Sequence, residues 1–316
     1  MTDIDFLINK YYESGEVTSA ETSSHWRKYS QSFQVKRVDS GKQRRDKENS
    51  SQSLEVPGLD NYEIKGVGFG NFKHLTVLNS TLELPISIYL AIVLWRKLTR
   101  YTFMKTWRYT KNTGQIFGYD ITRMALTVDF LQREIGNLDG KTFCLIGDGY
   151  GRLGSLLKEV YPNSRIIYIN LGKTLLFDYI YSLKAHPSSQ HLLKRVDSES
   201  FADFTYIEAE SYREWKIEAN VFINIASMQE MNFDAIFDYF SLIKSQPSGT
   251  YFYCANRISK TLPDGSVIKF HEYPWKDLEI LKDELCPWYQ KFPSLRPPFI
   301  RKFDGPIQHR LTCVVK

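Results

Sequence analysis

The chain of 316 residues is 42% hydrophobic, which is enough to bury a sizeable core. Its formal net charge of +5 is mild and dispersed, which argues against a nucleic-acid-binding protein but suits a partner with phosphate or carboxylate groups. The four cysteines are far apart without metal-ligand spacing, and the longest apolar run, 84–95, is shorter than the ~20 residues of a membrane span. Together with the lack of a secretory signal in the first ten residues, these features predict a cytoplasmic protein with reduced thiols, no bound metal and no membrane span.

The first 110 residues predict a helical cap. Apolar residues at helical spacing between Ile4 and Tyr11 predict a short helix. Residues 34–56 are polar and charged, which predicts a mobile segment near the mouth of a pocket. The largely apolar stretch 83–105 predicts one long helix.

From residue 110 onward the pattern predicts an α/β domain that extends to residue 316. The predicted strands are 142–147, 165–170, 203–208, 221–225, 249–255 and 310–315, and the predicted helices are 120–135, 151–160, 173–184 and 233–244. Strands and helices in alternation predict a parallel sheet with helices on both faces. The last strand has no helix before it, so we expect it to enter the sheet antiparallel.

A glycine-rich turn follows the first of these strands. The apolar run 143–146 breaks into Gly147-Asp148-Gly149-Tyr150-Gly151, and a helix begins at once. Glycine tolerates positive φ in such a turn and allows a ligand to approach the backbone closely. The arrangement is typical of a nucleotide-binding α/β domain.

The spacing of these glycines does not by itself identify the nucleotide that binds. Gly149-x-Gly151-x-x-Gly154 matches the dinucleotide pattern, so an NAD-dependent sugar oxidoreductase is one alternative. That interpretation expects an acid at the end of the second strand, where the chain has Asn170.

The region from about 140 to 316 also resembles a known family. The residues that carry the resemblance are IGDGYGRLGSLL (146–157), FINIASMQEM (222–231), YFYCANR (251–257), LPDG (262–265), DELCPWYQKFP (283–293) and FDGPIQHRL (303–311). In order and spacing they resemble the bacterial sugar O-methyltransferases that depend on S-adenosyl-L-methionine. The resemblance implies a Rossmann-like class I methyltransferase fold, with a mostly parallel sheet, an antiparallel last strand and the N-terminal helical cap. It implies a sugar or nucleotide-sugar acceptor and leaves a homodimer open.

The resemblance further implies a set of cofactor-binding residues. These are Gly147, Asp148, Gly149, Tyr150, Gly151, Asn170, Glu210 and Ser227. The glycines would pass beneath the methionine and ribose parts of the cofactor, and Asn170 would bind the ribose hydroxyls. Glu210 would meet the adenine and Ser227 would flank the sulfonium. Leu145 and Asn170 stand where many such enzymes have acids, which keeps a non-catalytic carbohydrate-binding or scaffold module as a further alternative.

Methyl transfer to a hydroxyl needs a group that removes the proton of the acceptor. Glu230 lies after the fourth strand, where ligands sit in such sheets, although an acid at a helix start also suits the helix dipole. His271 and His309 are the next candidates for catalysis, and each could instead be structural.

The aromatic, proline-rich segment 256–309 is the expected platform for the acceptor. Sugar faces pack on aromatic rings, and arginines pair with a diphosphate or an acidic sugar. The residues expected to bind the acceptor are Arg257, Tyr273, Trp275, Trp288, Tyr289 and Arg310. The same aromatic residues could instead form a hydrophobic cover over the sheet edge.

Overall fold

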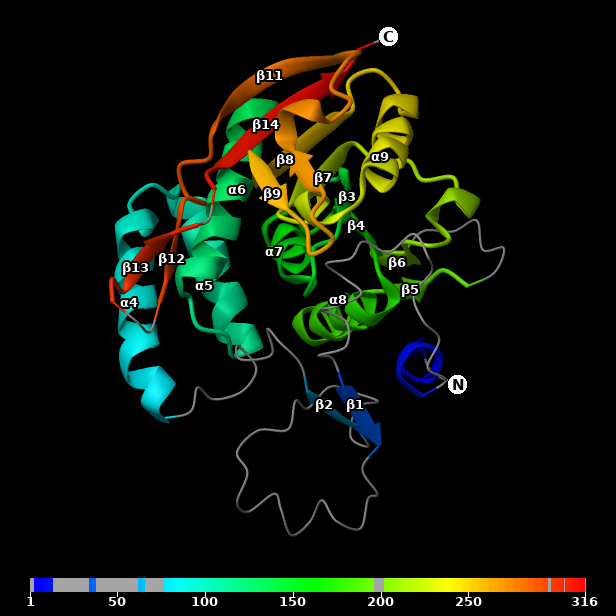
Figure 1. The fold of residues 1–316 in the computed structure, drawn as a ribbon. Coiled ribbons are helices and arrows are strands. Elements are labelled where there is room, and N and C mark those ends of the chain that lie inside the picture. The colour runs from blue at the N-terminus through cyan, green and yellow to red at the C-terminus, as the bar shows by residue number, and fades with distance from the viewer. Residues whose placement is uncertain are drawn as a thin grey trace.

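A computed structural model describes residues 3–13, 34–37, 62–65, 77–195, 202–294, 297–303 and 305–315. An eight-stranded sheet runs through the domain, with helices on both faces (Figure 1). The strands, in their order across the sheet, are β11 (Leu278–Leu285), β14 (Ile307–Val314), β8 (Tyr251–Arg257), β7 (Val221–Ile225), β3 (Thr142–Ile146), β4 (Arg165–Asn170), β6 (Phe204–Glu208) and β5 (His191–Leu193).

Strand direction identifies the fold. The pairs from β8 across to β5 are parallel, whereas β14 is antiparallel to both of its neighbours, β8 and β11. A mostly parallel sheet with one antiparallel strand next to its edge is the Rossmann-like class I methyltransferase fold. The predicted fold class is therefore confirmed, including the antiparallel last strand.

The helices divide between two hydrophobic cores. One core holds α6 (Tyr119–Ile135), α7 (Arg152–Val160) and α8 (Gly172–Ala185), and the other holds α9 (Phe233–Ser245). Successive residues of a strand face opposite sides, so Phe143 of β3 lies in the first core and Cys144 in the second. Within the described ranges, no helix is both long and apolar enough to cross a bilayer.

The helix predicted over 83–105 is two helices, α4 (Val77–Trp95) and α5 (Arg100–Thr113). The chain breaks because Thr99 caps α5: its backbone is extended and its hydroxyl accepts from the N–H of Thr102. The carboxylate of Asp129 holds this cap, accepting from the N–H of Thr99 at 2.6 Å and from its hydroxyl at 2.7 Å. The prediction of a single helix was wrong because the apolar content of the stretch hid the cap.

The sheet contains one long strand that sequence patterning did not predict. β11 lies at the sheet edge, and Leu278 is its only buried residue, so it lacks the alternation that marks a half-buried strand. Three small antiparallel pairs complete the strands described: β1 (Gln34–Arg37) with β2 (Tyr62–Lys65), β9 (Ser259–Thr261) with β10 (Val267–Lys269), and β12 (Lys291–Pro293) with β13 (Ile300–Lys302).

The N-terminal part of the chain contributes α1 (Asp3–Ile8) and a π-helical turn, η1 (Asn9–Glu13). Ile4, Leu7, Ile8 and Tyr11 are buried in the first core, as the helical spacing suggested. Residues 34–37, at the start of the segment predicted to be mobile, form β1, and residues 38–56 of that segment lie outside the described residues.

Candidate functional site

The glycine turn between β3 and α7 has the backbone that only glycine adopts readily. Gly147, Gly149 and Gly151 have φ values of 73°, 82° and 59°. A Cβ at Gly147 would overlap Ser227 Oγ, so the turn packs directly against the end of β7. At Gly149, apart from its chain neighbours, no atom of the residues that the structure describes lies within 4 Å of the place of a Cβ.

Asp178, on α8, supports this turn from inside the protein. Its Oδ1 accepts from the N–H of Gly151 at 2.6 Å, and its Oδ2 accepts from Nδ2 of Asn170 at 2.7 Å. The side chain is fully buried. Sequence reasoning missed this residue, although an acid within a mostly apolar helix is a signal that could have been followed.

The side chain of Asn170 is likewise directed inward, at the end of β4. Its Oδ1 accepts from the N–H of Leu171 at 2.9 Å and from the hydroxyl of Thr174 at 2.7 Å, while its amide donates to Asp178. Only 6% of the residue is exposed. Asn170 therefore joins the start of α8 to the support of the glycine turn.

Asp148 is a second, partly buried acid at the turn. It accepts from the N–H of Gly154 at 3.2 Å, which caps the start of α7. Burial raises the pKa of Asp148 to about 6. Burial, reinforced by the charge of Asp148, also raises the pKa of Asp178 well above its usual range.

Two more acids, Glu208 and Glu210, lie where β6 ends. Glu208 is in register with Asn170, and its Oε2 forms an ion pair with Lys10 at 2.6 Å. Its Oε1 is buried and has no hydrogen-bond partner within the described part of the chain. A buried acceptor of this kind calls for a donor.

The N-terminal segment 3–13 covers this edge of the sheet (Figure 1). The hydroxyl of Tyr11 donates to Glu210 Oε2 at 3.2 Å, and the hydroxyl of Tyr12 donates to the carbonyl of Lys173 at 3.0 Å. A Cβ at Gly172 would overlap the ring of Tyr11, so this ring lies directly on the backbone at the start of α8. The cap thus contributes side chains to the same edge as Glu208 and Glu210.

The backbone is strained where β7 ends. Ala226 has a φ of 56°, in the left-handed region that residues with a side chain seldom adopt. Its N–H donates to the carbonyl of Ala255 in the neighbouring strand at 2.8 Å, which holds it there. Strain of this kind gathers at functional sites, and here it sets Ser227 against Gly147.

The short 3-10 helix η4 (Met228–Glu230) follows this strained residue. Glu230 forms an ion pair with Lys260 of β9, and both side chains are largely buried, at 17% and 12% exposure. The side chain of Gln229 accepts from the N–H of Arg257 at 2.8 Å, which ties η4 to the end of β8. The structure thus brings Ser227, Glu230 and Arg257 to the same edge as the glycine turn.

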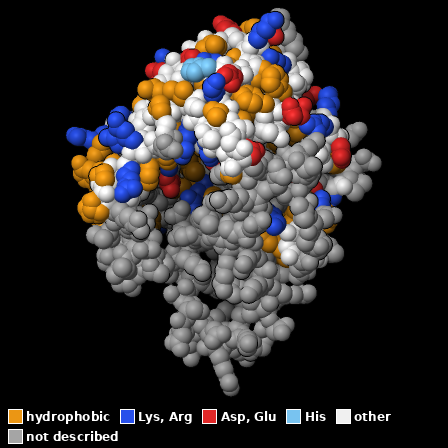
Figure 2. Space-filling view, in the orientation of Figure 1, with side chains coloured by type: hydrophobic (Ala, Val, Ile, Leu, Met, Phe, Trp, Pro, Cys, Tyr) orange, Lys and Arg blue, Asp and Glu red, His pale blue; other side chains and the backbone are white. Residues whose placement is uncertain are grey.

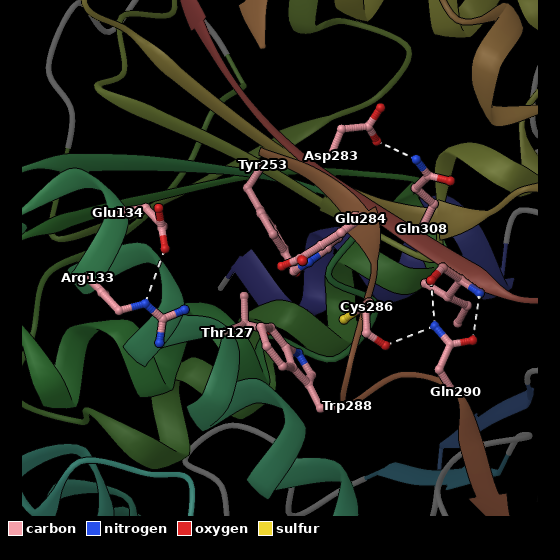
Figure 3. A network of polar contacts seen from close by, with 12 residues as sticks. Thr127, Arg133, Glu134, Tyr253, Asp283, Glu284, Cys286, Trp288, Gln290 and Gln308 are labelled. Atoms are coloured by element: carbon pink, nitrogen blue, oxygen red, sulfur yellow. Dashed lines mark hydrogen bonds and ion pairs between the residues drawn. The ribbon is translucent and has the colours of Figure 1, made fainter. Parts of the chain in front are cut away.

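His309 and Trp288 lie inside the first core rather than at this edge. His309 is fully buried, with its Nδ1 3.0 Å from the hydroxyl of Tyr253. Trp288 is also buried and donates from Nε1 to the hydroxyl of Thr127 on α6 at 3.1 Å; Figure 3 shows Trp288, Thr127 and Tyr253 close together. These contacts hold both side chains within the packed interior.

Three other residues expected at the acceptor lie in or beside the second core. Tyr273 and Trp275 are buried there, and the guanidinium of Arg310 lies 4.4 Å from the ring centre of Trp275 and pairs with Asp283. His271 is exposed on η5 (Phe270–Glu272). The structure does not bring these residues to the glycine turn.

Tyr150 lies beside the glycine turn, whereas Tyr289 is buried in the first core, as Trp288 is. The ring of Tyr150 stacks 5.9 Å from that of Phe177, beside the glycines. The ring of Tyr289 lies 4.7 Å from the guanidinium of Arg123 on α6. Within the described residues, no group of three or more His, Cys, Asp or Glu side chains is arranged to hold a metal.

Neither a protein-family model nor a curated protein matches the chain. Solved structures that are similar to it include TrmN from Thermus thermophilus, with 10% identity, coverage of 61% of this chain and 49% of that chain, and a TM-score of 0.40. Coclaurine N-methyltransferase, bound to N-methylheliamine and SAH, has 12% identity, coverage of 52% and 51%, and a TM-score of 0.39. The cyclopropane synthase MmaA2 from Mycobacterium tuberculosis has 12% identity, coverage of 52% and 64%, and a TM-score of 0.40. The chain spans 49 to 64% of the length of these three proteins, and similarity at this level concerns the fold alone.

Proposed function

We propose that the protein is an S-adenosyl-L-methionine-dependent O-methyltransferase that acts on a sugar hydroxyl, in a nucleotide sugar or a surface glycan. The observation that carries the proposal is the open glycine turn. It follows the strand β3 of a class I methyltransferase sheet, it has three left-handed glycines, and the Cβ position of Gly149 has no close neighbour among the described residues beyond the adjoining ones. Ligands in open α/β sheets bind at this carboxyl edge.

The residues at the edge suit the adenosine part of the cofactor. The buried Oε1 of Glu208 is an acceptor without a donor among the described residues, and a ribose diol offers hydroxyl donors. Glu210 and Tyr11 lie next to it, on the side where we place the adenine. Ser227, held against Gly147, is our candidate neighbour of the sulfonium. When bound, S-adenosyl-L-methionine supplies an activated methyl group.

The chain itself must orient the acceptor hydroxyl and take its proton. We propose that the carboxylate of Glu230 removes this proton. Lys260 holds that carboxylate in a largely buried ion pair at the same edge. A fixed carboxylate loses little entropy when it aligns with a hydroxyl, which is how positioning contributes to such a reaction.

A direct assay tests this proposal. The protein is incubated with S-adenosyl-L-methionine carrying a labelled methyl group and with a panel of nucleotide sugars, and the products are examined by mass spectrometry. We expect one sugar to gain a labelled methyl group on oxygen. Glu230→Gln should bind S-adenosylhomocysteine as the parent does and transfer the label far more slowly. A panel that stays unlabelled, with a cofactor that does not bind, would argue for the non-catalytic carbohydrate-binding or scaffold module.

A further inference from the structure

An arginine without an acidic partner lies where β8 ends. The N–H of Arg257 is fixed by Gln229, and its guanidinium lies 5.9 Å from the ring centre of Phe303. The residue is partly buried, and its Nε is buried without a hydrogen-bond partner. No ion pair of Arg257 occurs within the described ranges. Burying a cation is costly unless an anion pairs with it.

A second arginine lies against the same ring. The guanidinium of Arg123 is 5.8 Å from the ring centre of Phe303 and 4.7 Å from those of Tyr119 and Tyr289. Its side chain is 12% exposed and forms an ion pair with Asp120. Phe303 therefore links two cations that come from distant parts of the chain, α6 and β8.

The neighbouring charges leave Arg257 as the uncompensated one. Asp120 neutralises Arg123, and Glu230 neutralises Lys260. Figure 2 shows a hollow on this face of the molecule, in the area where Figure 1 shows α6, α7 and β9, with basic side chains in and around it. The local charge balance thus favours a negatively charged group at the end of β8.

We propose that Arg257 binds an oxyanion carried by the methyl acceptor, a phosphate or a carboxylate, with the ring of Phe303 as the apolar side of the binding site. The guanidinium presents a planar fork of donors that matches such groups, and its stacking on Phe303 holds that fork in place. The inference rests on the proposed function only in identifying the bound anion as part of the acceptor. It narrows the substrate class to acidic or phosphorylated sugars, including nucleotide sugars.

Calorimetric titration with simple probes tests this proposed anion-binding site. Pyrophosphate represents a nucleotide-sugar diphosphate, D-glucuronate represents an acidic sugar, and D-glucose is the neutral control. Each is titrated into the full-length protein at low salt, with and without saturating S-adenosylhomocysteine. Arg257→Gln removes the cation, and Arg133→Gln, at an exposed position of α6, is the matched control.

We expect at least one anion to bind and D-glucose to bind more weakly. Arg257→Gln should weaken that binding at least tenfold, and Arg133→Gln should leave it unchanged. The preference between pyrophosphate and D-glucuronate then identifies the kind of oxyanion. Equal binding by the parent and Arg257→Gln, or no binding of either anion, would overturn the proposal. The titrations without S-adenosylhomocysteine keep this outcome separate from a failure of the protein to bind the cofactor.

Discussion

The amide of Asn170 donates to the carboxylate of Asp178 at 2.7 Å, and this bond explains an unusual residue at the end of β4. From the family that the sequence resembles, we expected an acid at that position. Here an acid would set two buried carboxylates against each other, whereas the amide supplies the donor that Asp178 needs. The sequence led us to expect Asn170 at the ribose, and the structure gives its side chain three partners inside the protein.

The first prediction is that Asn170→Asp destabilises the protein. The new carboxylate would lie beside that of Asp178 and would leave it without a donor, a loss of about 1–3 kcal/mol for a buried polar group. Chemical denaturation at neutral pH measures this. The exchanged pair, Asn170→Asp with Asp178→Asn, restores one amide and one carboxylate and should recover most of the loss. A double variant as unstable as the sum of both single variants would show that the two side chains do not interact.

The second prediction concerns the buried oxygen of Glu208. Glu208→Gln removes the charge that we assign to the ribose diol, so the affinity for S-adenosylhomocysteine should fall about tenfold, equivalent to ~1.4 kcal/mol. Glu214→Gln is the control, because Glu214 is exposed in the nearby 3-10 helix η3 (Tyr212–Glu214). If both variants bind that ligand as the parent does, Glu208 is not part of the cofactor site.

The third prediction concerns the cap. Tyr11→Ala uncovers the backbone at Gly172 and removes the hydrogen bond to Glu210. We expect faster dissociation of S-adenosylhomocysteine, by about tenfold, because the segment 3–13 lies over the proposed adenosine edge. Tyr11→Phe keeps the ring and should have a smaller effect. Stopped-flow displacement measures the rates, and unchanged dissociation in Tyr11→Ala would mean that the cap only supports the fold.

The fourth prediction is a loss of stability as the pH rises, caused by Asp148. Its pKa in the folded protein is raised to about 6 from an ordinary value of 3.8. Between these values the folded state holds a proton that the unfolded state has lost, so the free energy of unfolding falls as the pH rises through this window. Asp148→Asn should flatten the profile and gain about 1–2 kcal/mol at pH 7.5, less than the full shift because the side chain is partly exposed.

Denaturant titrations from pH 4.5 to 8 check this expectation. Asp234→Asn is a suitable control, because Asp234 is an exposed acid in the first turn of α9. A profile that stays as steep in Asp148→Asn as in the parent would assign the dependence to other groups, with Asp178 the first to examine.

The sequence predicted the parallel strands except the short β5, and it predicted the antiparallel last strand, because buried strands and amphipathic helices leave strong patterns. It did not predict β11, whose apolar residues after Leu278 are exposed at the sheet edge and do not alternate with polar ones, or the break at Thr99, which depends on the distant Asp129. The residues that bind the methyl acceptor were harder still to predict from the sequence. His309 and Arg310 are neighbours in one strand and must face opposite sides of the sheet, so the two could not both have reached the site.

Contacts between separate elements explain the remaining differences between the expected and the observed surroundings of the glycine turn. Asp178 supports the glycine turn from α8, and Lys10 reaches Glu208 from the N-terminal segment. Neither contact follows from spacing along the chain, since both depend on how the elements pack. The sequence therefore indicated the edge of the sheet at which we propose the site, while the contacts between elements at that edge required the structure.

The most direct test of this account is isothermal titration of the full-length protein with S-adenosylhomocysteine and, separately, with NAD. We predict that S-adenosylhomocysteine binds with one site per chain and that NAD shows no comparable binding. Tight binding of NAD would instead favour the oxidoreductase that the glycine spacing also allows. That result, or a protein that binds neither ligand, would contradict the methyltransferase proposal.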